Sequence, residues 1–217
     1  MTYPCLVLDH DDTVVNSTAT IHHPCFQEYL NSRYPGRTCS LEDYFKKNFA
    51  PGFVEMCREE YGMDDAALQD ETEFWKKYVA QHIPSAYPGM NELMCRHKAE
   101  GGYICVVSHS FDENIRRDYA ENGLPEPDLV FGWEQPPERR KPNPWPLEEI
   151  MRRLGLAPEE LLMIDDLKPG FDMAHSCGVD FAAAGWAYDV PQIEDFMRRN
   201  SDFYFKTVQE LADFLGE

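Results

Sequence analysis

Four aspartates follow directly on two short apolar runs, and this placement points to metal chemistry. Asp9 and Asp11 come after one run, and Asp165 and Asp166 come after another that lies far along the chain. If both runs are parallel strands of one open sheet, their carboxyl ends meet where such sheets bind ligands. Crowded carboxylates repel one another, and a hard divalent cation with oxygen ligands relieves that repulsion. The pattern therefore predicts a Mg²⁺ site at this edge of the sheet.

Phosphate-binding groups are expected at the same edge. Ser108 and His109 follow a third apolar run, and Lys141 lies in the loop after a weaker one. A hydroxyl, an ammonium group and the backbone N–H groups at a helix N-terminus are donors that hold phosphoryl oxygens. Because a phosphate cannot approach bare carboxylates, these donors would act together with the metal. The residues thus predict a site for a small phosphorylated molecule.

These groups resemble the four sequence motifs of the haloacid dehalogenase superfamily, in the order of that family. The motif residues are Asp9-x-Asp11-x-Thr13, Ser108, Lys141-Pro142 and Asp165-Asp166. The resemblance covers the whole chain, since the segment after the first motif is similar to the family's C1-type helical cap. It implies a hydrolase of the phosphatase branch: a Mg²⁺-dependent enzyme that hydrolyses a small phosphorylated metabolite through an aspartyl-phosphate.

The resemblance also implies a role for each motif residue. Asp9 is implied as the nucleophile, and Asp11 as the general acid that protonates the leaving oxygen and then as the base that activates water. The implied Mg²⁺ ligands are Asp9, Asp11 through its main-chain oxygen, Asp166 and, directly or at a distance, Asp165. The implied phosphate-binding residues are Thr13, Ser108, His109 and Lys141.

Two positions depart from the family's pattern. His10 stands between the two acids of the first motif, where the family usually has an apolar residue. Gly170 stands in the fourth motif where many members place another aspartate, and Asp172 comes two residues later. These departures leave open the role of His10 and the choice of the carboxylates that bind the metal directly.

Other functions are compatible with the same motifs. A phosphomutase resembling beta-phosphoglucomutase shares the motifs and the cap, and only its product, an isomerised sugar phosphate, separates it from a phosphatase. A dehalogenase or a phosphonate hydrolase is disfavoured by the second acid, Asp11. A non-catalytic binding module on the same fold is a further alternative. The presence of Asp9, Asp11 and Lys141 argues against it.

Alternation of apolar runs and helix patterns predicts an α/β fold with a doubly wound, Rossmann-like parallel sheet that is covered on both faces. The strands are expected at residues 6–8, 103–107, 129–131, 161–164, 180–183 and 203–205. Helices are expected around residues 90–97, 115–119, 147–154 and 207–215. The connections between parallel strands should be right-handed crossovers.

A long segment after the first strand has a different pattern of apolar residues. Residues 17–87 contain no buried-strand run, and their apolar spacing is helical. We therefore predict a helical cap domain over residues 17–87, inserted into a core domain made of residues 1–16 and 88–217. The turn-rich residues 84–89 suit a hinge. The choice of substrate would depend on the cap, whose sequence contains no recognisable motif.

The charge of the chain excludes some partners. The 217 residues contain 39 acidic and 20 basic side chains, for a formal charge of −19. Such acidity argues against nucleic acids and anionic membrane surfaces. The seven cysteines form no CxxC pair, and the first residues enter a strand-like run without a signal-peptide pattern. We therefore expect a cytoplasmic protein with reduced thiols, a monomer or homodimer, whose partner is the small phosphorylated metabolite.

Overall fold

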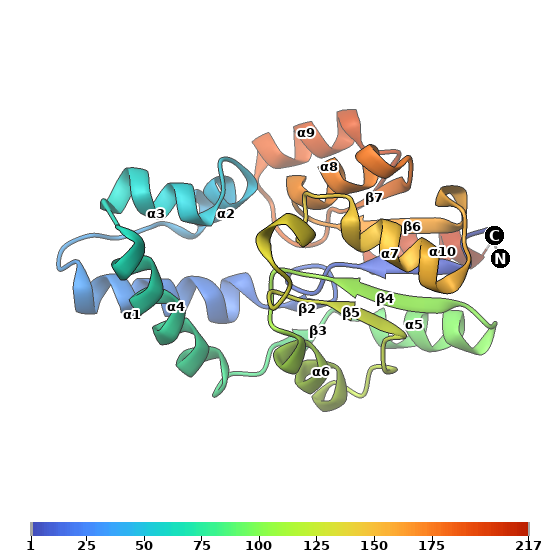
Figure 1. The fold of residues 1–217 in the computed structure, drawn as a ribbon, viewed down its shortest axis with the longest axis horizontal. Coiled ribbons are helices and arrows are strands. Elements are labelled where there is room, and N and C mark those ends of the chain that lie inside the picture. The colour runs from blue at the N-terminus through green and yellow to red at the C-terminus, as the bar shows by residue number, and fades with distance from the viewer. Residues whose placement is uncertain (1, 217) are drawn as a thin grey trace.

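Six parallel strands form the sheet that carries the fold. The computed structural model describes residues 2–216, so the outermost residues of the predicted core range, 1 and 217, lie outside it. The strands are β1 (Cys5–Leu8), β4 (Tyr103–Val107), β5 (Leu129–Phe131), β6 (Leu161–Asp165), β7 (Asp180–Ala184) and β8 (Phe203–Phe205). Their order is β5-β4-β1-β6-β7-β8 (Figure 1). The predicted α/β class and all six predicted strands are confirmed.

Helices cover both faces of this sheet, as predicted. One face packs on α5 (Met90–Ala99), α6 (Asp112–Glu121) and α10 (Val208–Gly216). The other packs on α7 (Trp145–Leu154), α8 (Lys168–Cys177) and α9 (Pro191–Asn200). In β1, Leu6 and Leu8 face the first group of helices, and Cys5 and Val7 face the second. Because both faces are buried, each central strand is a continuous apolar run rather than an alternating one.

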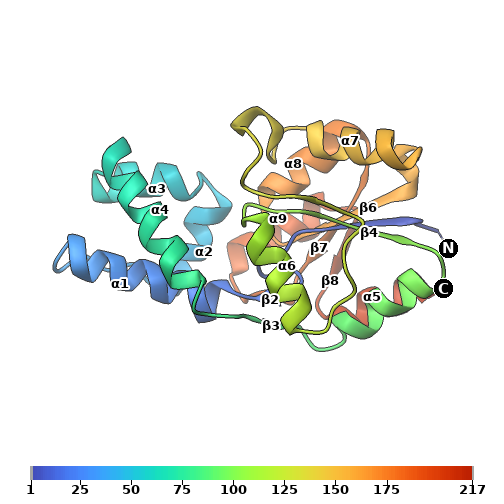
Figure 2. The ribbon, with the colours of Figure 1, turned by 60° about the horizontal axis from the view of Figure 1, so that its bottom comes forward.

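A separate group of helices lies to one side of the sheet (Figures 1 and 2). A short π-helix, Thr18–His22, leads into α1 (His23–Arg33), α2 (Leu41–Phe49), α3 (Phe53–Tyr61) and α4 (Asp65–Val79). The helix α2 is capped by Ser40, whose hydroxyl accepts from the backbone N–H of Asp43 at 3.0 Å. These helices share an apolar cluster built around Phe26, Tyr29 and Met56. The segment is therefore largely helical, while its predicted limits at residues 17 and 87 stay a prediction.

The chain passes between the sheet and these helices twice, and the two passages are paired. β2 (Val15–Asn16) and β3 (Ser85–Ala86) form a two-stranded antiparallel ribbon. This ribbon was not predicted, because two-residue strands are too short to show an apolar alternation. The expected hinge at residues 84–89 thus contains a strand. None of the helices in residues 2–216 is both long and apolar enough to cross a membrane.

Candidate active site

A buried lysine joins two carboxylates at the carboxyl ends of the central strands. Strands β1 and β6 are neighbours, with Leu8 beside Ile164, so Asp9 and Asp165 emerge next to each other. Nζ of Lys141 lies 2.7 Å from Oδ1 of Asp9 and 2.7 Å from Oδ2 of Asp165. All three side chains are buried. The structure therefore brings together three residues that the sequence analysis placed at one site.

The same strand ends supply a donor set for a divalent cation. Carboxylate oxygens of Asp9, Asp165 and Asp166 lie within 4.8 Å of one another, and all three residues are buried. Burial raises the pKa of Asp9 to about 7; Lys141 opposes this rise, and Asp165 and Asp11 add to it. Burial and the neighbouring Asp165 raise the pKa of Asp166 well above its ordinary value. Crowded, buried carboxylates are the hard oxygen ligands that Mg²⁺ takes, so this cluster fits that ion.

Gly170 is explained by the side chain of Asp165. Oδ1 of Asp165 accepts from the backbone N–H of Leu167 at 2.7 Å, while its Oδ2 binds Lys141. A Cβ atom at position 170 would lie 2.6 Å from Cβ of Asp165 and 2.2 Å from its Oδ2. A larger residue at this position would therefore displace Asp165. Gly170, the second departure from the family's pattern, therefore leaves room for Asp165 in the position where it contacts Lys141.

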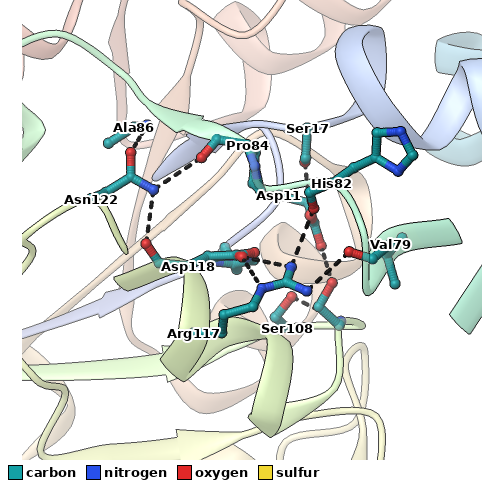
Figure 3. Close-up of polar contacts among 12 residues, drawn as sticks. Asp11, Ser17, Val79, His82, Pro84, Ala86, Ser108, Arg117, Asp118 and Asn122 are labelled. Atoms are coloured by element: carbon teal, nitrogen blue, oxygen red, sulfur yellow. Dashed lines mark hydrogen bonds and ion pairs between the residues drawn. The ribbon is translucent and has the colours of Figure 1, made fainter. Parts of the chain in front are cut away.

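Three hydrogen-bond donors surround Asp11. Its Oδ1 accepts from the Ser17 hydroxyl at 2.7 Å and lies 2.8 Å from Nε2 of His22, and its Oδ2 accepts from the Ser110 hydroxyl at 2.6 Å (Asp11 and Ser17 are labelled in Figure 3). Burial alone would raise the pKa of Asp11, but His22 and Ser110 outweigh it and hold the pKa well below its ordinary value. Asp11 is thus kept ionised and fixed in direction.

His22 connects Asp11 to a tryptophan of α4. The indole N–H of Trp75 donates to Nδ1 of His22 at 3.0 Å. An indole nitrogen can only donate, so Nδ1 accepts and the imidazole proton lies on Nε2, facing Asp11. Asp11, His22 and Trp75 line a small cleft together with Asn114 and other residues of α6. The sequence analysis did not select Ser17, His22 or Ser110, because their roles depend on where the helical segment sits.

Replacing His22 with alanine is expected to lower kcat by about 10- to 100-fold, because Asp11 loses one of the three donors that fix its direction. Trp75→Phe removes only the indole N–H and should cause a smaller loss in the same direction. The matched control is His23→Ala, since His23 contacts the Cys39 carbonyl at 2.8 Å and not Asp11. Steady-state phosphate release measures all three variants. Equal losses in the His22 and His23 variants would contradict a specific role for His22.

The predicted phosphate-binding residues other than Lys141 each have a different hydrogen-bond partner. Ser108 is buried at the end of β4, and its hydroxyl accepts from the backbone N–H of Ser110 at 3.0 Å. Nε2 of His109 lies 2.9 Å from the Lys141 carbonyl oxygen, so this ring contacts the loop that carries the lysine. The hydroxyl of Thr13 is buried and directed at Oδ1 of Asp166, 3.5 Å away.

The rim opposite α6 carries a second contact with the helical segment. The Tyr188 hydroxyl donates to the Asp166 carbonyl oxygen at 2.9 Å. Its ring packs on Phe45 of α2, with 4.1 Å between the ring centroids. The indole of Trp186 donates to the Thr13 carbonyl oxygen at 3.1 Å. Both aromatic residues, which the sequence did not assign, therefore hold backbone carbonyls next to the carboxylate cluster.

Comparison with known proteins shows which family the chain belongs to. The chain is 24% identical to the pyrophosphatase PpaX of Halalkalibacterium halodurans over 97% of its own length and 96% of the relative's. It is 24% identical to a phosphoglycolate phosphatase of Aquifex aeolicus, covering 96% of this chain and 99% of that one. Its fold matches a haloacid dehalogenase-like family hydrolase from Streptococcus pneumoniae with a TM-score of 0.77 and 14% identity, over 99% of both chains. The family model described as "Haloacid dehalogenase-like hydrolase" matches residues 6–184, so the chain belongs to that family, as its motifs indicated.

Proposed function

We propose that the protein is a Mg²⁺-dependent phosphatase that hydrolyses a small phosphorylated metabolite through an aspartyl-phosphate. The observation that carries this proposal is the buried Asp9–Lys141–Asp165 contact with Asp166 and an ionised Asp11 beside it. Family membership and the names of the relatives, pyrophosphatase and phosphoglycolate phosphatase, support phosphatase activity in general.

Asp9 is proposed as the nucleophile. Attack by a carboxylate divides the transfer of a phosphoryl group from the substrate to water into two easier steps. Lys141 contacts Oδ1 of Asp9 at 2.7 Å, which fixes the carboxylate and places a positive charge where phosphoryl oxygens would lie. In phosphoryl transfer the protein mainly supplies alignment and charge stabilisation. Ser108, at the end of the neighbouring strand β4, is placed to add a hydroxyl to the same region.

Asp9 and Asp166 are the carboxylates that would hold Mg²⁺, together with the main-chain oxygen of Asp11. Asp165 is proposed as a less direct partner, because both its oxygens already accept hydrogen bonds, from Leu167 and Lys141. When bound, Mg²⁺ offsets the repulsion between these carboxylates and a phosphate dianion. The raised pKa values of Asp9 and Asp166 are consistent with a cluster built for such a cation.

Asp11 is proposed as the general acid and then the base. Its three donors favour the carboxylate, which is the form that accepts a proton from water in the second step. In the first step Asp11 would have to take up a proton from solvent, against the preference set by its donors, before passing it to the leaving oxygen. The cleft beside it, lined by Trp75 and Asn114 among others, is the proposed place of the leaving group. Residues from α4 and α6 would therefore both contact that group.

The helical segment over residues 17–87 is proposed as a C1-type cap, with residues 1–16 and 88–217 as the core domain. Its contacts support this division, since His22 lies 2.8 Å from Oδ1 of Asp11 and Phe45 packs on Tyr188 of the core. The cysteines are all free thiols, including Cys5 and Cys105, whose sulfurs are 3.7 Å apart. Free thiols support a cytoplasmic location.

Phosphate release from a panel of phosphoglycolate, pyrophosphate, sugar phosphates and an aryl phosphate is the test. We expect turnover with Mg²⁺ and a fall of about 100-fold or more when the metal is removed by a chelator. Isomerised sugar phosphate in place of free phosphate would show a phosphomutase. Absence of turnover across the panel would overturn the proposal and favour a non-catalytic module.

A further inference from the structure

His10 has a partner that its sequence position does not suggest. The residue is 1% exposed, and its Nε2 lies 3.1 Å from Oδ2 of Asp118 in α6. Its ring stacks on Tyr119, with 5.9 Å between the centroids. The His10 carbonyl accepts from the backbone N–H groups of Val14 and Val15 at 3.0 and 3.1 Å. His10 thus ties the loop that carries both proposed catalytic acids to α6.

Asp118 is also bound to the neighbouring arginine. Its Oδ1 lies 2.8 Å from Nε and 2.7 Å from Nη2 of Arg117, and the Asp118 side chain is 4% exposed. Asp118 accepts hydrogen bonds from the guanidinium, and a carboxylate has only acceptor oxygens. His10 must therefore donate from Nε2. The apolar residue that the family usually has at this position could not make the contact.

The other end of Arg117 binds the segment that returns from α4 to the core. Nη1 donates to the Val79 carbonyl oxygen at 2.9 Å, and Nη2 donates to the His82 carbonyl oxygen at 3.3 Å (Figure 3). Val79 is the last residue of α4, so the guanidinium closes the end of that helix. One planar group thus holds a carboxylate on one side and two carbonyls on the other, which suits arginine and not lysine.

We propose that His10, Asp118 and Arg117 form a positioning relay that couples the end of α4 to the loop between Asp9 and Asp11. When the end of α4 is in place, both halves of the guanidinium are bound, and Asp118 is held where it orients His10. When α4 moves away, Arg117 loses two acceptors and His10 loses a fixed partner. The coupling acts in both directions, because a coupling free energy is reciprocal. Its effect on turnover rests on the proposed function, while the coupling itself does not.

Hydrogen exchange of the full-length chain tests the coupling without reference to activity. In His10→Leu, amides of residues 79–86 should exchange about tenfold faster although the substitution lies in another element. In Arg117→Gln, amides of residues 10–15 should exchange faster by a similar factor. Tyr119→Phe is the matched control, since it removes a buried hydroxyl that has no hydrogen-bond partner within residues 2–216, from a ring that stacks on His10. Unchanged exchange in His10→Leu, or an equal change in Tyr119→Phe, would overturn the relay.

Two further variants keep the test decisive. If His10→Leu does not fold, Arg117→Lys replaces it, because lysine keeps the charge near Asp118 but cannot span the carboxylate and both carbonyls. It should speed exchange in residues 10–15 as Arg117→Gln does, and wild-type exchange there would refute the coupling.

In kinetics, His10→Leu and Arg117→Gln should each lower kcat about tenfold, and the double variant should lose little more. A multiplied loss would mean two independent effects and would also refute the relay.

The exchange measurements and the kinetic measurements test the relay and the proposed function separately. A wild-type protein without turnover would contradict the proposed phosphatase, and the exchange measurements would still decide on the relay. Normal turnover with uncoupled exchange would contradict the relay alone.

Discussion

Asp9→Asn is expected to lower Mg²⁺-dependent phosphate release by about 10³-fold or more, because an amide cannot attack a phosphoryl group. The substitution keeps the shape of the side chain, so the 2.7 Å ion pair is replaced by a hydrogen bond from the Lys141 ammonium group to a neutral amide oxygen. Burial raises the pKa of Asp9 to about 7, and removing one of the crowded carboxylates should not lower stability. The loss of activity therefore should not come from unfolding.

Asp12→Asn is the matched control for this prediction. Asp12 belongs to the same loop and is also buried, but its Oδ1 accepts from the backbone N–H groups of Ser17 and Thr18 at 3.3 and 3.1 Å. An amide oxygen can accept the same two bonds, so this variant should keep most of the activity. Thermal unfolding checks that both variants are folded. An Asp9→Asn protein that retained a large part of the wild-type rate would rule out Asp9 as the nucleophile.

The strands and the carboxylate cluster were predictable from the sequence because they depend on local pattern and on sheet geometry. Strands that are buried on both faces appear as continuous apolar runs, and parallel strands place their last residues at one edge. Asp9 and Asp165 therefore could be placed side by side although they are distant in sequence. Lys141 could be assigned to the same edge because its loop follows a predicted strand, but its contacts with both carboxylates could not be predicted, since loops show no such pattern.

Two helices escaped prediction for a physical reason. α8 contains Pro169 and Gly170 in its first turn, and α9 begins at Pro191. Proline and glycine close together usually indicate a turn. In the first turn of a helix, however, proline loses no hydrogen bond, because the first N–H groups have no partner within the helix. Gly170 is needed there because the side chain of Asp165 fills the adjacent space.

The contacts made by the helical segment could not be predicted at all. His22 reaches Asp11, and Arg117 reaches Val79, only because the helical segment is placed against the first loop and α6. Helical periodicity shows which face of α4 is apolar, but it does not show which core residue that face will meet. The partner of His10 is 108 residues away, on a helix whose own pattern is ordinary. Such contacts follow from tertiary packing and not from local sequence.

Glu71→Gln is expected to raise the free energy of unfolding by about 3 kcal/mol at pH 8 and by less than about 1 kcal/mol at pH 5. Glu71 lies in α4 and is 5% exposed. Burial raises its pKa from 4.5 to about 7, with His22 opposing the rise. Below pH 4.5 the carboxyl is protonated in both the folded and the unfolded chain, so burying it causes no pH-dependent loss of stability there.

As the pH rises from 4.5 to 7, the unfolded chain ionises first and the folded protein loses stability; above 7 both forms are ionised and the loss is complete. Glutamine has no such loss, so its advantage must grow with pH across this window. Urea unfolding at the two pH values measures it. Glu73→Gln on the same helix is the control, since Glu73 is exposed and its ion pair with Lys76 contributes little. If Glu71→Gln raised the free energy of unfolding by the same amount at both pH values, the gain would come from better packing of glutamine. Ionisation of Glu71 would then not be what weakens the helical segment.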